Sequence, residues 1–390
     1  MLRFSTAGES HGQALIALLS GLPAGVPLEV AFVRRELWRR QQGYGRGGRM
    51  RIEQDTPEFL SGIRNGFTIG SPVAIQIVNH DWKNWEQTLG VETPAGVHAR
   101  PVQSPRPGHA DLAGTLKYSF KEARYVLERA SARETAARVA AGALAKLLLR
   151  ELGIEVCSHV VSVGAAALDP ATAITQTALR ALAARDEILL HCLDQVSEQH
   201  MKAEVDRVLR SGDTVGGVFE LRAYGLPPGL GTCSNWDERL DGRIAQAIMS
   251  IQAVKAVELG AGIAVAAALG SEAQDPIGYD ASARRFTRQG NHAGGLEGGM
   301  SNGEEIVVRG FLKPISTLRR PLASVDFTTR EPVKAAYERS DVCVVPAAAV
   351  VGEAMLALML AQAVLEKFGS DSLVELRRNY NAYGEQLRNF

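Results

Sequence analysis

The stretch from Cys343 to Leu365 is apolar over a length that suits either a membrane span or a helix in a protein core. Pro346 stands near its start, Glu353 lies within it, and its many alanines anchor poorly in lipid. A helix that is apolar on nearly every side needs to be covered, so we expect this one to be buried. The pattern predicts a core helix from Pro346 to Lys367, with Gly369 as its stop signal.

The rest of the chain alternates between helical and strand patterns that are separated by glycine-rich loops. No linker or low-complexity stretch divides it, so residues 1–390 are expected to form a single domain of α/β class. The expected helices lie at about 131–152 and 241–257, the expected strands at 73–78, 215–221 and 305–311, and the main glycine-rich loops at 43–48, 225–231 and 290–303.

Two of the expected strands have a similar lead-in. The segment Gly66–Gly70 (GFTIG) precedes the strand at 73–78, and Gly299–Gly303 (GMSNG) precedes the strand at 305–311. An internal duplication of an α/β unit would produce such a pair. Chance is the simpler explanation for so short a match, so both interpretations stay open.

The charges of the 390-residue chain cancel, with 43 Lys and Arg against 43 Asp and Glu. Proteins that bind nucleic acid or an acidic membrane usually carry a basic excess, so neither partner is expected. The aromatic content of 6% offers few stacking platforms, which also weighs against an RNA-binding protein. Any anion site must therefore be a local concentration of positive charge.

The cysteines and the N-terminus both point to a reducing, cytoplasmic setting. The four cysteines are too widely spaced for a zinc ribbon or a disulfide framework, so they are expected to be reduced and mostly buried. The first eleven residues lack the apolar core of a signal peptide. No motif for a metal, a nucleoside triphosphate or a serine hydrolase is present, and no metal is expected. The cysteines are Cys157, Cys192, Cys233 and Cys343.

Positive charge is concentrated in the segment from Arg34 to Arg51, which contains seven arginines, no lysine and one acid, Glu36. Its second half is a glycine-rich loop in which guanidinium groups are able to converge on one point. Arginine suits planar, bidentate contact with phosphate or carboxylate. A solvated basic face is the alternative, and it suits Arg34, Arg35 and Arg39 better than Arg46 and Arg49.

A second candidate anion site is the segment ERASARE, residues 128–134. Ser131 followed by Glu134 is a capping box, in which hydroxyl and carboxylate each satisfy a free backbone N–H. A helix that begins there would direct amides and partial positive charge outward, and Arg129 and Arg133 would add full charges. Many helices begin in this way and bind nothing, so this interpretation is also open.

Two histidines lie in unusual surroundings. His11 follows Gly8-Glu9-Ser10 and precedes an apolar run, and His109 lies in the segment RPGHAD. Histidine exchanges protons near neutral pH, which makes both residues candidate acid–base groups. A hydrogen-bonded structural histidine is the commoner situation for either one alone.

Several of these segments resemble the chorismate synthase family. They occur in the family's order over residues 8 to about 341, so the resemblance covers essentially the whole chain. The matching segments are Gly8–Gly12, Arg39–Glu53 (RRQQGYGRGGRMRIE), Ser104–Asp111 (SPRPGHAD), Glu128–Ala137 (ERASARETAA), Gly298–Gly303 (GGMSNG), Lys313–Thr317 (KPIST) and Glu338–Asp341 (ERSD).

The resemblance implies a lyase that eliminates phosphate in an anti-1,4 fashion from 5-enolpyruvylshikimate 3-phosphate, giving chorismate. It implies reduced FMN as cofactor without net redox change, an α+β sandwich of antiparallel sheets around helices, and a homotetramer. An external flavin reductant is expected, because no further nucleotide-binding fingerprint is visible in the sequence. The rival is a flavin-binding module without lyase activity.

The resemblance also assigns roles to individual residues. His11 would be the acid at the leaving phosphate, His109 would stabilise the reduced flavin, and Asp341 would relay the proton at flavin N5. The implied substrate contacts are Ser10, Arg40, Arg46, Arg49, Arg106 and Arg133. The family's nicotinamide-nucleotide positions fall on Arg40 and Arg46, although these suit the substrate phosphate better. The implied flavin contacts are Arg129, Ala130, Ser131, Gln252, Ala253, Gly298, Lys313, Pro314, Ile315, Ser316, Thr317 and Arg339.

Overall fold

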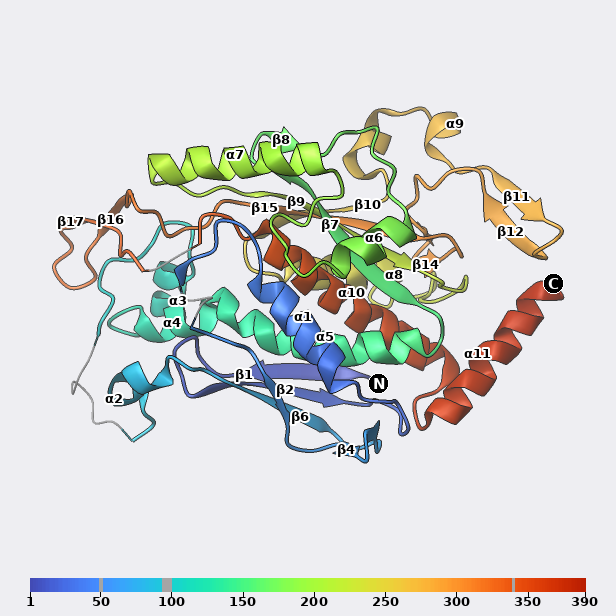
Figure 1. The fold of residues 1–390 in the computed structure, drawn as a ribbon, viewed down its shortest axis with the longest axis horizontal. Helices are drawn as coiled ribbons and strands as arrows, with labels where there is room; N and C mark the ends of the chain where they lie inside the picture. The colour runs from blue at the N-terminus through green and yellow to red at the C-terminus, as the bar shows by residue number, and fades with distance from the viewer. Residues whose placement is uncertain (49–51, 93–99, 339–340) are drawn as a thin grey trace.

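Two larger antiparallel sheets enclose a layer of helices in the part of the chain that the computed structural model describes, residues 1–48, 52–92, 100–338 and 341–390 (Figure 1). The layer contains α1 (Val30–Gln41), α5 (Thr135–Arg150) and α10 (Val345–Phe368). Helix α5 contacts the first sheet and α10 contacts the second. The expected mixture of helices and antiparallel sheets is therefore confirmed.

The first sheet has the strand order β1-β2-β6-β3. Strand β6 covers Val73–Val78, the range that the sequence predicts, and its buried residues Val73, Ile75 and Ile77 alternate with less buried ones. This period of two turns one face of the strand toward the helices. The other strands are β1 (Arg3–Ala7), β2 (Ala14–Ser20) and β3 (Pro57–Phe59).

The second sheet has the order β10-β15-β9-β7-β8. Helix α10 packs closely on this sheet because two glycines, one on the helix and one on β15, leave room for the ring of Phe219. A Cβ atom at Gly352 of α10 would lie 2.8 Å from the ring of Phe219, and one at Gly310 would lie 2.3 Å from the same ring. The strands are β7 (Glu155–Val163), β8 (Ala166–Ala167), β9 (Gly217–Tyr224), β10 (Val254–Leu259) and β15 (Ile306–Leu312).

Helix α10 is the expected core helix. Pro346 lies in its first turn, and Gly369 ends it with a φ of +99°, a conformation that favours glycine. It is long and apolar enough to cross a membrane, but 89% of its most apolar window is buried inside the protein. The helix is therefore part of the core, as the alanines and Glu353 indicate.

Two sequence-based helix boundaries are wrong. The helix expected over 241–257 is α8 (Leu240–Met249), and the chain then enters β10 at Val254, which pairs with β15. The positive φ of Ala253, +71°, separates the two elements. The helix expected from Ser131 is divided into the 3₁₀ turn η3 (Ala132–Glu134) and α5. Sheet pairing and local packing outweigh helical periodicity at both places.

The two similar lead-ins have a similar local form. Hairpin β4–β5 (Ile63–Arg64 and Phe67–Thr68) precedes β6, and hairpin β13–β14 (Leu296–Glu297 and Met300–Ser301) precedes β15. The internal duplication itself stays a prediction.

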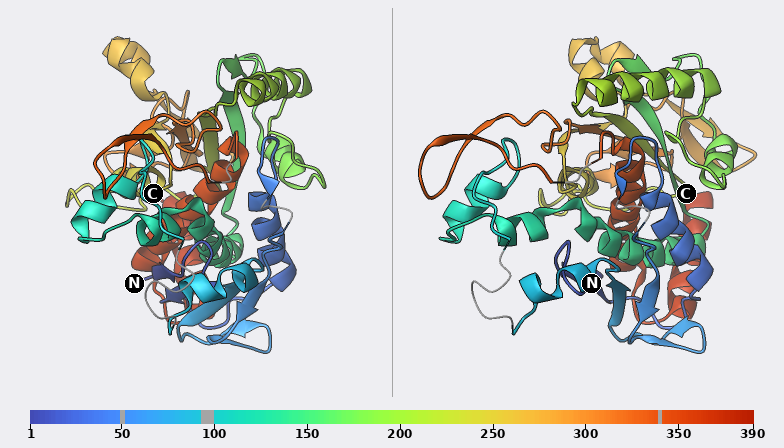
Figure 2. Two further views of the ribbon diagram at one scale, coloured as in Figure 1. Left: turned by 90° about the vertical axis from the view of Figure 1, so that its left-hand side faces the viewer. Right: turned by 60° about the vertical axis from the view of Figure 1, so that its left-hand side comes forward.

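A long strap after β15 crosses the chain segment that follows residue 100 (Figure 2). Its hairpin β16–β17 (Ala323–Val325 and Pro332–Lys334) is flanked by backbone hydrogen bonds from Phe327 to Gln103 and from Ala336 to Ser104. The strap thereby leads toward Asp341. The remaining helices are η2 (Trp82–Asn84), α2 (Glu86–Leu89), α3 (Asp111–Lys117), α4 (Arg124–Ala130), α6 (Gln176–Ala183), α7 (Gln195–Ser211), η4 (Gly262–Ala267), α9 (Gly270–Ala273) and α11 (Leu373–Arg388), and hairpin β11–β12 covers Ile277–Asp280 and Arg285–Arg288.

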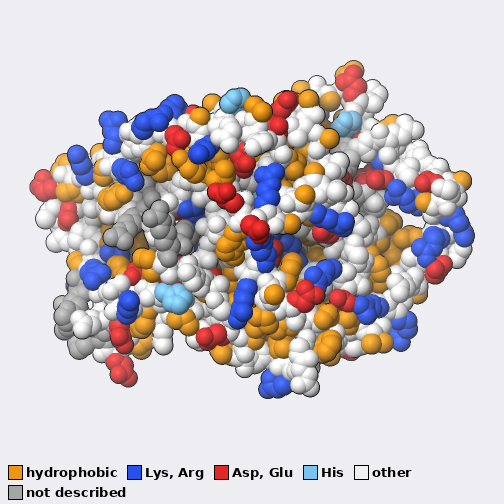
Figure 3. All heavy atoms as spheres, in the orientation of Figure 1, with side chains coloured by type: hydrophobic (Ala, Val, Ile, Leu, Met, Phe, Trp, Pro, Cys, Tyr) orange, Lys and Arg blue, Asp and Glu red, His pale blue; other side chains and the backbone are white. Residues whose placement is uncertain are grey.

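One face of the molecule mixes both signs of charge. On the face that Figure 3 shows, Lys and Arg side chains alternate with Asp and Glu side chains. This face has no extended basic stripe of the kind that nucleic-acid-binding proteins carry. Two residues of the arginine-rich segment, Arg39 and Arg40, are each only 3% exposed and lie in the interior.

Candidate active site

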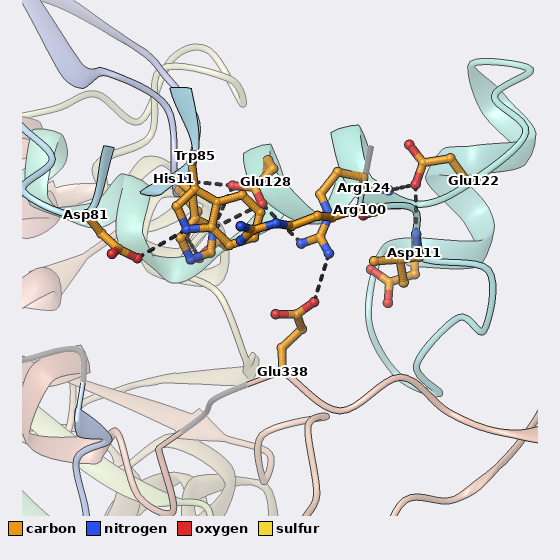
Figure 4. Close-up of polar contacts among 12 residues, drawn as sticks. His11, Asp81, Trp85, Arg100, Asp111, Glu122, Arg124, Glu128 and Glu338 are labelled. Carbon is orange, nitrogen blue, oxygen red and sulfur yellow. Dashed lines mark hydrogen bonds and ion pairs between the residues drawn. The ribbon is translucent and has the colours of Figure 1, made fainter. Parts of the chain in front are cut away.

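His11 is held by a buried carboxylate and an indole ring (Figure 4). Its Nδ1 lies 3.0 Å from both carboxylate oxygens of Glu128, and its backbone N–H donates to Oε2 at 2.8 Å. The imidazole stacks on Trp85 with the ring centroids 4.2 Å apart. Burial alone would raise the pKa of Glu128, but the hydrogen bonds and charges of His11 and Arg124 lower it below its ordinary value.

The loop that carries His11 is fastened to α4. The backbone N–H of Ser10 donates to the carbonyl of Glu128 at 2.9 Å, and its hydroxyl lies 3.1 Å from that of Ser131. Arg129 donates to the carbonyl of Gly8 at 3.0 Å. Ser10 thus stands beside His11 as expected, whereas the exposed Arg129 directs its guanidinium at the backbone of the first sheet.

Ser131 lies at the junction of α4 and η3 and not at a free helix start. Its hydroxyl accepts a hydrogen bond from the Arg133 N–H at 3.3 Å, as a capping residue does. The other hydrogen bond of the expected capping box, from the Ser131 backbone N–H to the Glu134 carboxylate, was predicted wrongly. The Glu134 carboxylate instead accepts from the Thr6 hydroxyl of β1 at 2.8 Å and from its i,i+4 neighbour Arg138 at 3.0 Å.

Arg40 and Arg133 converge on the Asp55 carboxylate in a buried cluster. Arg133 Nη1 donates to Asp55 Oδ1 at 2.6 Å, and Arg40 Nη1 lies 3.4 Å from Oδ2. Arg133 Nε donates to Asn79 at 2.9 Å. Burial lowers the pKa of Arg40 to about 10, although Asp55 opposes the shift. Arg40 therefore stays protonated at neutral pH.

One donor of this cluster lacks an acceptor. Arg133 Nη2 is buried, lies 3.6 Å from a Glu53 oxygen, and makes no hydrogen bond with any residue that the structure describes. A buried guanidinium N–H without an acceptor is costly. An anionic ligand that reached Arg133 would provide the missing acceptor.

Arg39 points away from this cluster into the helical layer. It is only 3% exposed and donates to both oxygens of Glu353 at 2.7 Å and to Glu36 at 2.8 Å. Lys146 donates to Glu36 at 2.7 Å and to Glu353 at 2.5 Å. The interpretation of Arg39 as part of a solvated face is therefore wrong, because it is buried between Glu36 of its own helix and Glu353 of α10. Arg34 is exposed, as that interpretation expects.

Asp341 closes the glycine-rich loop that follows α1. The Gly47 N–H donates to Asp341 Oδ1 at 2.5 Å, and Arg46 Nε lies 3.2 Å from Oδ2. The Val342 N–H donates to the Gly45 carbonyl at 2.7 Å. Two segments from opposite ends of the chain thus place a carboxylate and a guanidinium side by side.

His109 belongs to a second ionic cluster. Its Nδ1 lies 2.5 Å from Asp111 Oδ1 and 3.0 Å from Arg106 Nη2. Arg106 Nε also donates to Asp111 Oδ2 at 2.8 Å, and its Nη1 donates to the Thr317 hydroxyl at 2.8 Å. Burial alone would raise the pKa of Asp111, but His109 and Arg106 lower it well below its ordinary range.

A cavity of about 770 Å³ is lined by Lys313, Pro314, Ile315 and Ser316. Its walls also carry the cations Arg319, Arg320 and Lys334 against a single acid, Asp213. This volume is typical of ligand pockets. The size and the positive lining suit a mononucleotide that carries a phosphate group.

Hydrogen bonds link the His11 region to the Lys313 segment. Gln252 Nε2 donates to Glu134 at 3.2 Å, and the Lys313 N–H donates to the carbonyl of the adjacent Ala253 at 3.0 Å. Thr317 then joins this segment to Arg106. The histidines, the buried arginines and the cavity wall therefore form one connected region, which combines cationic side chains with groups able to transfer protons.

A protein-family model described as chorismate synthase matches residues 2–365. The chain belongs to the chorismate synthase family. A chorismate synthase of Koribacter versatilis (strain Ellin345) is 65% identical over 394 residues, and one of Solibacter usitatus (strain Ellin6076) is 62% identical over 391 residues, with 100% of both chains covered in each case. A solved structure titled "Crystal Structure of Chorismate Synthase" is 40% identical, covers 100% of this chain and 99% of that one, and superposes with a TM-score of 0.80.

The chorismate synthase family assigns this chain lyase activity in aromatic biosynthesis. Most of the site residues predicted for the family lie in the connected region, but a few do not. Arg49 and Arg339 lie outside the described residues. Gly298 forms the turn of hairpin β13–β14, where a Cβ atom would meet nothing within 4 Å. Ala130 is half-buried at the end of α4.

The residues that hold the predicted ones do not stand out in the sequence of this chorismate synthase family member. Trp85 and Asp55 lie in no segment on which the resemblance rests, and the pattern around Glu128 predicts only a helix start. For Glu128 alone the sequence gives a hint, because a histidine that acts in acid–base chemistry needs a carboxylate or carbonyl partner for its second ring nitrogen. Which of the 43 acids provides it depends on the fold.

Proposed function

We propose that this chorismate synthase eliminates phosphate in an anti-1,4 fashion from 5-enolpyruvylshikimate 3-phosphate, using reduced FMN without net redox change. The observation that carries the proposal is the buried Arg133 Nη2, which has no acceptor among the residues that the structure describes. Arg133 shares the Asp55 carboxylate with Arg40, and Ser131, two residues before it, contacts Ser10 next to His11. A substrate with one phosphate and two carboxylates would meet several fixed cations there and provide acceptors for them.

The substrate contacts would come from three parts of the chain. Arg40 and Arg133 would supply buried cations. Arg46 would supply a third cation from the glycine-rich loop, and Arg106 a fourth from the cluster that contains His109. Arg49 is proposed on the resemblance alone. Fixed guanidinium groups favour a step in which negative charge develops on the departing phosphate, because they need no reorganisation. Ser10 would hold the loop that presents His11.

Reduced FMN would be held by the segment from Lys313 to Thr317, with the cavity beside it providing the room. Ser131, Gln252 and Ala253 border the same region, and Arg129, Ala130, Gly298 and Arg339 are proposed on the resemblance alone. When bound, reduced FMN supplies electron density to an electron-poor reaction centre. His109, fixed by Asp111 and Arg106, would stabilise negative charge on the cofactor.

Two side chains of this protein would move the protons. His11 would donate a proton from Nε2 to an oxygen of the departing phosphate. Asp341, fixed by the Gly47 N–H and Arg46, would relay at flavin N5 the proton that the substrate ring loses. The ring proton is weakly acidic, so Asp341 would act on it only with the cofactor in place.

The oligomeric state, the cellular location and the source of reduced flavin are also proposed from the resemblance. We expect a single-domain subunit, a cytoplasmic homotetramer and an external source of reduced flavin. The core, which is continuous from Leu2 to Leu376, supports the single domain. A role of Arg40 and Arg46 toward NADP is less favoured, because the same two arginines are proposed to serve the substrate phosphate.

Phosphate release from the enolpyruvyl substrate, with FMN reduced anaerobically, tests the function. Steady-state release under these conditions is expected. FMN binding without release would favour the flavin-binding module, and neither binding nor release would reject both. Salt-dependent RNA binding at micromolar protein would favour the RNA-binding alternative. NADPH as sole reductant would then show whether the chain reduces its own flavin.

Arg46→Ala is expected to raise KM for the substrate about 10- to 100-fold, because a charge-assisted hydrogen bond is worth about 1.5–3 kcal/mol. The measurement is KM from initial rates with photoreduced FMN. Arg34→Ala is the matched control, since Arg34 is an exposed arginine of α1, and its KM should stay within about twofold of wild type. An unchanged KM in Arg46→Ala would contradict the substrate contact.

A further inference from the structure

We propose that Glu128 and Trp85 are the positioning residues of His11, which together leave Nε2 as the ring nitrogen that serves the departing phosphate. The inference rests on the proposed function and adds two residues to its machinery. Neither would touch the substrate, and both would act only through the imidazole.

Glu128 fixes the direction of the ring. Its carboxylate is 1% exposed and contacts His11 twice, at Nδ1 and at the backbone N–H. A carboxylate accepts and never donates when it is ionised, so Nδ1 must carry the hydrogen. Because the backbone contact holds the same carboxylate, the side chain and main chain of His11 are fixed as one unit.

Trp85 fixes the plane of the ring. The indole is stacked on the imidazole with an interplanar angle of 25°, and its Nε1–H donates to Asp81 Oδ2 at 3.2 Å. The guanidinium groups of Arg100 and Arg124 lie over the indole ring, with Cζ 4.5 Å and 5.2 Å from its centroid. With plane and direction both fixed, the imidazole has one orientation.

The surrounding charges keep Glu128 ionised and in place. Arg124 lies on the same helix, 3.4 Å from Glu128 Oε1, and also pairs with Glu338 of the strap at 3.1 Å (Figure 4). Arg124 would therefore keep a partner if Glu128 lost its charge. Among the described residues, Glu9 lies two positions before His11 on the same loop, and Asp81 accepts from the indole of Trp85.

This arrangement fits a proton transfer from Nε2. The C–O bond to phosphate breaks, phosphate keeps the electron pair, and one of its oxygens takes the Nε2 proton from the doubly protonated ring. The neutral ring that remains carries its hydrogen on Nδ1, where Glu128 already accepts it. No rearrangement of the imidazole is needed before or after the transfer.

A double-mutant cycle tests the inference. Glu128→Gln is expected to lower kcat about 10- to 100-fold with KM within about twofold of wild type, the usual loss when the partner of an orienting histidine is removed. In a His11→Asn background the same change should alter kcat by less than about twofold, because Glu128 acts through the imidazole. Equal losses in both backgrounds would overturn the proposal.

Trp85→Leu provides a second variant that leaves the ion pairs of Glu128 in place. It should lower kcat in the wild-type background and have little effect in the His11→Asn background. Glu220→Gln is the matched control, since buried Glu220 holds buried His159 Nε2 at 3.2 Å in another part of the protein. Its kcat should stay within about twofold of wild type. A loss as large as that of Glu128→Gln would overturn the proposal.

A measurement without turnover separates this inference from the proposed function. Nitrogen-15 NMR of labelled histidine reports which ring nitrogen carries the hydrogen. Neutral His11 is expected to carry it on Nδ1 in the wild type and to shift toward the Nε2–H form in Glu128→Gln. An unchanged tautomer would overturn the inference even if the enzyme releases phosphate, whereas a shift without phosphate release would reject only the function.

Discussion

His11→Asn is expected to lower kcat about 10²- to 10⁴-fold, the contribution that a positioned general acid commonly makes. The asparagine amide is able to donate to Glu128 from near the position of Nδ1, but it places nothing at Nε2. Anaerobic single-turnover release of phosphate measures the loss. A rate close to wild type would show that His11 is not the acid.

The same variant should keep its fold, because the buried Glu128 retains a donor. The free energy of unfolding is expected to stay within about 1 kcal/mol of wild type. His11→Ala is the informative comparison, since it removes both nitrogens and leaves Glu128 with Arg124 and the backbone N–H. Similar kcat losses with different stabilities would separate the chemical role of the ring from its structural role.

Glu353→Ala is expected to lower the free energy of unfolding by about 3–5 kcal/mol, the cost of removing one partner of a buried ion pair. Arg39 and Lys146 would be left with the single carboxylate of Glu36 in the middle of the helical layer. Urea denaturation followed by circular dichroism measures the change. A loss below about 1 kcal/mol would mean that water or a rearranged side chain replaces the carboxylate.

The matched control for this variant is Glu385→Ala. Glu385 pairs with Arg388 on the surface of α11, where both side chains are exposed. Surface pairs of this kind contribute only about 0–1 kcal/mol, so little change is expected. The contrast tests whether burial, and not the mere presence of an ion pair, determines the stability of the helical layer.

The sequence predicted the elements whose patterns are local. The apolar run with Pro346 and Gly369 gave α10, and alternation gave β6 over its observed range. It failed where a tertiary contact replaced a local one. Val254 leaves the helical pattern to pair with β15, and Glu134 leaves its capping position for Thr6, 128 residues away. Neither alternative is visible in a short window of sequence.

The candidate site shows the same division. Motifs around His11, Arg133, His109 and Asp341 identified the residue types that the chemistry needs. Their partners could not be predicted, because Glu128 is 117 residues from His11 and Asp341 is 294 residues from Gly47. Arg39 illustrates the consequence, since it is next to Arg40 in the sequence but pairs with Glu353 of α10, whereas Arg40 pairs with Asp55.

The sequence by itself determined the family, the core helix and the residues able to bind anions and transfer protons, because glycine, proline, apolar periodicity and motif order are properties of neighbouring residues. Only the tertiary structure decided which carboxylate each arginine and histidine meets, which arginines are buried, and which nitrogen of His11 is held. Those outcomes depend on distances between remote segments, and hydrogen bonds and ion pairs form only at contact range.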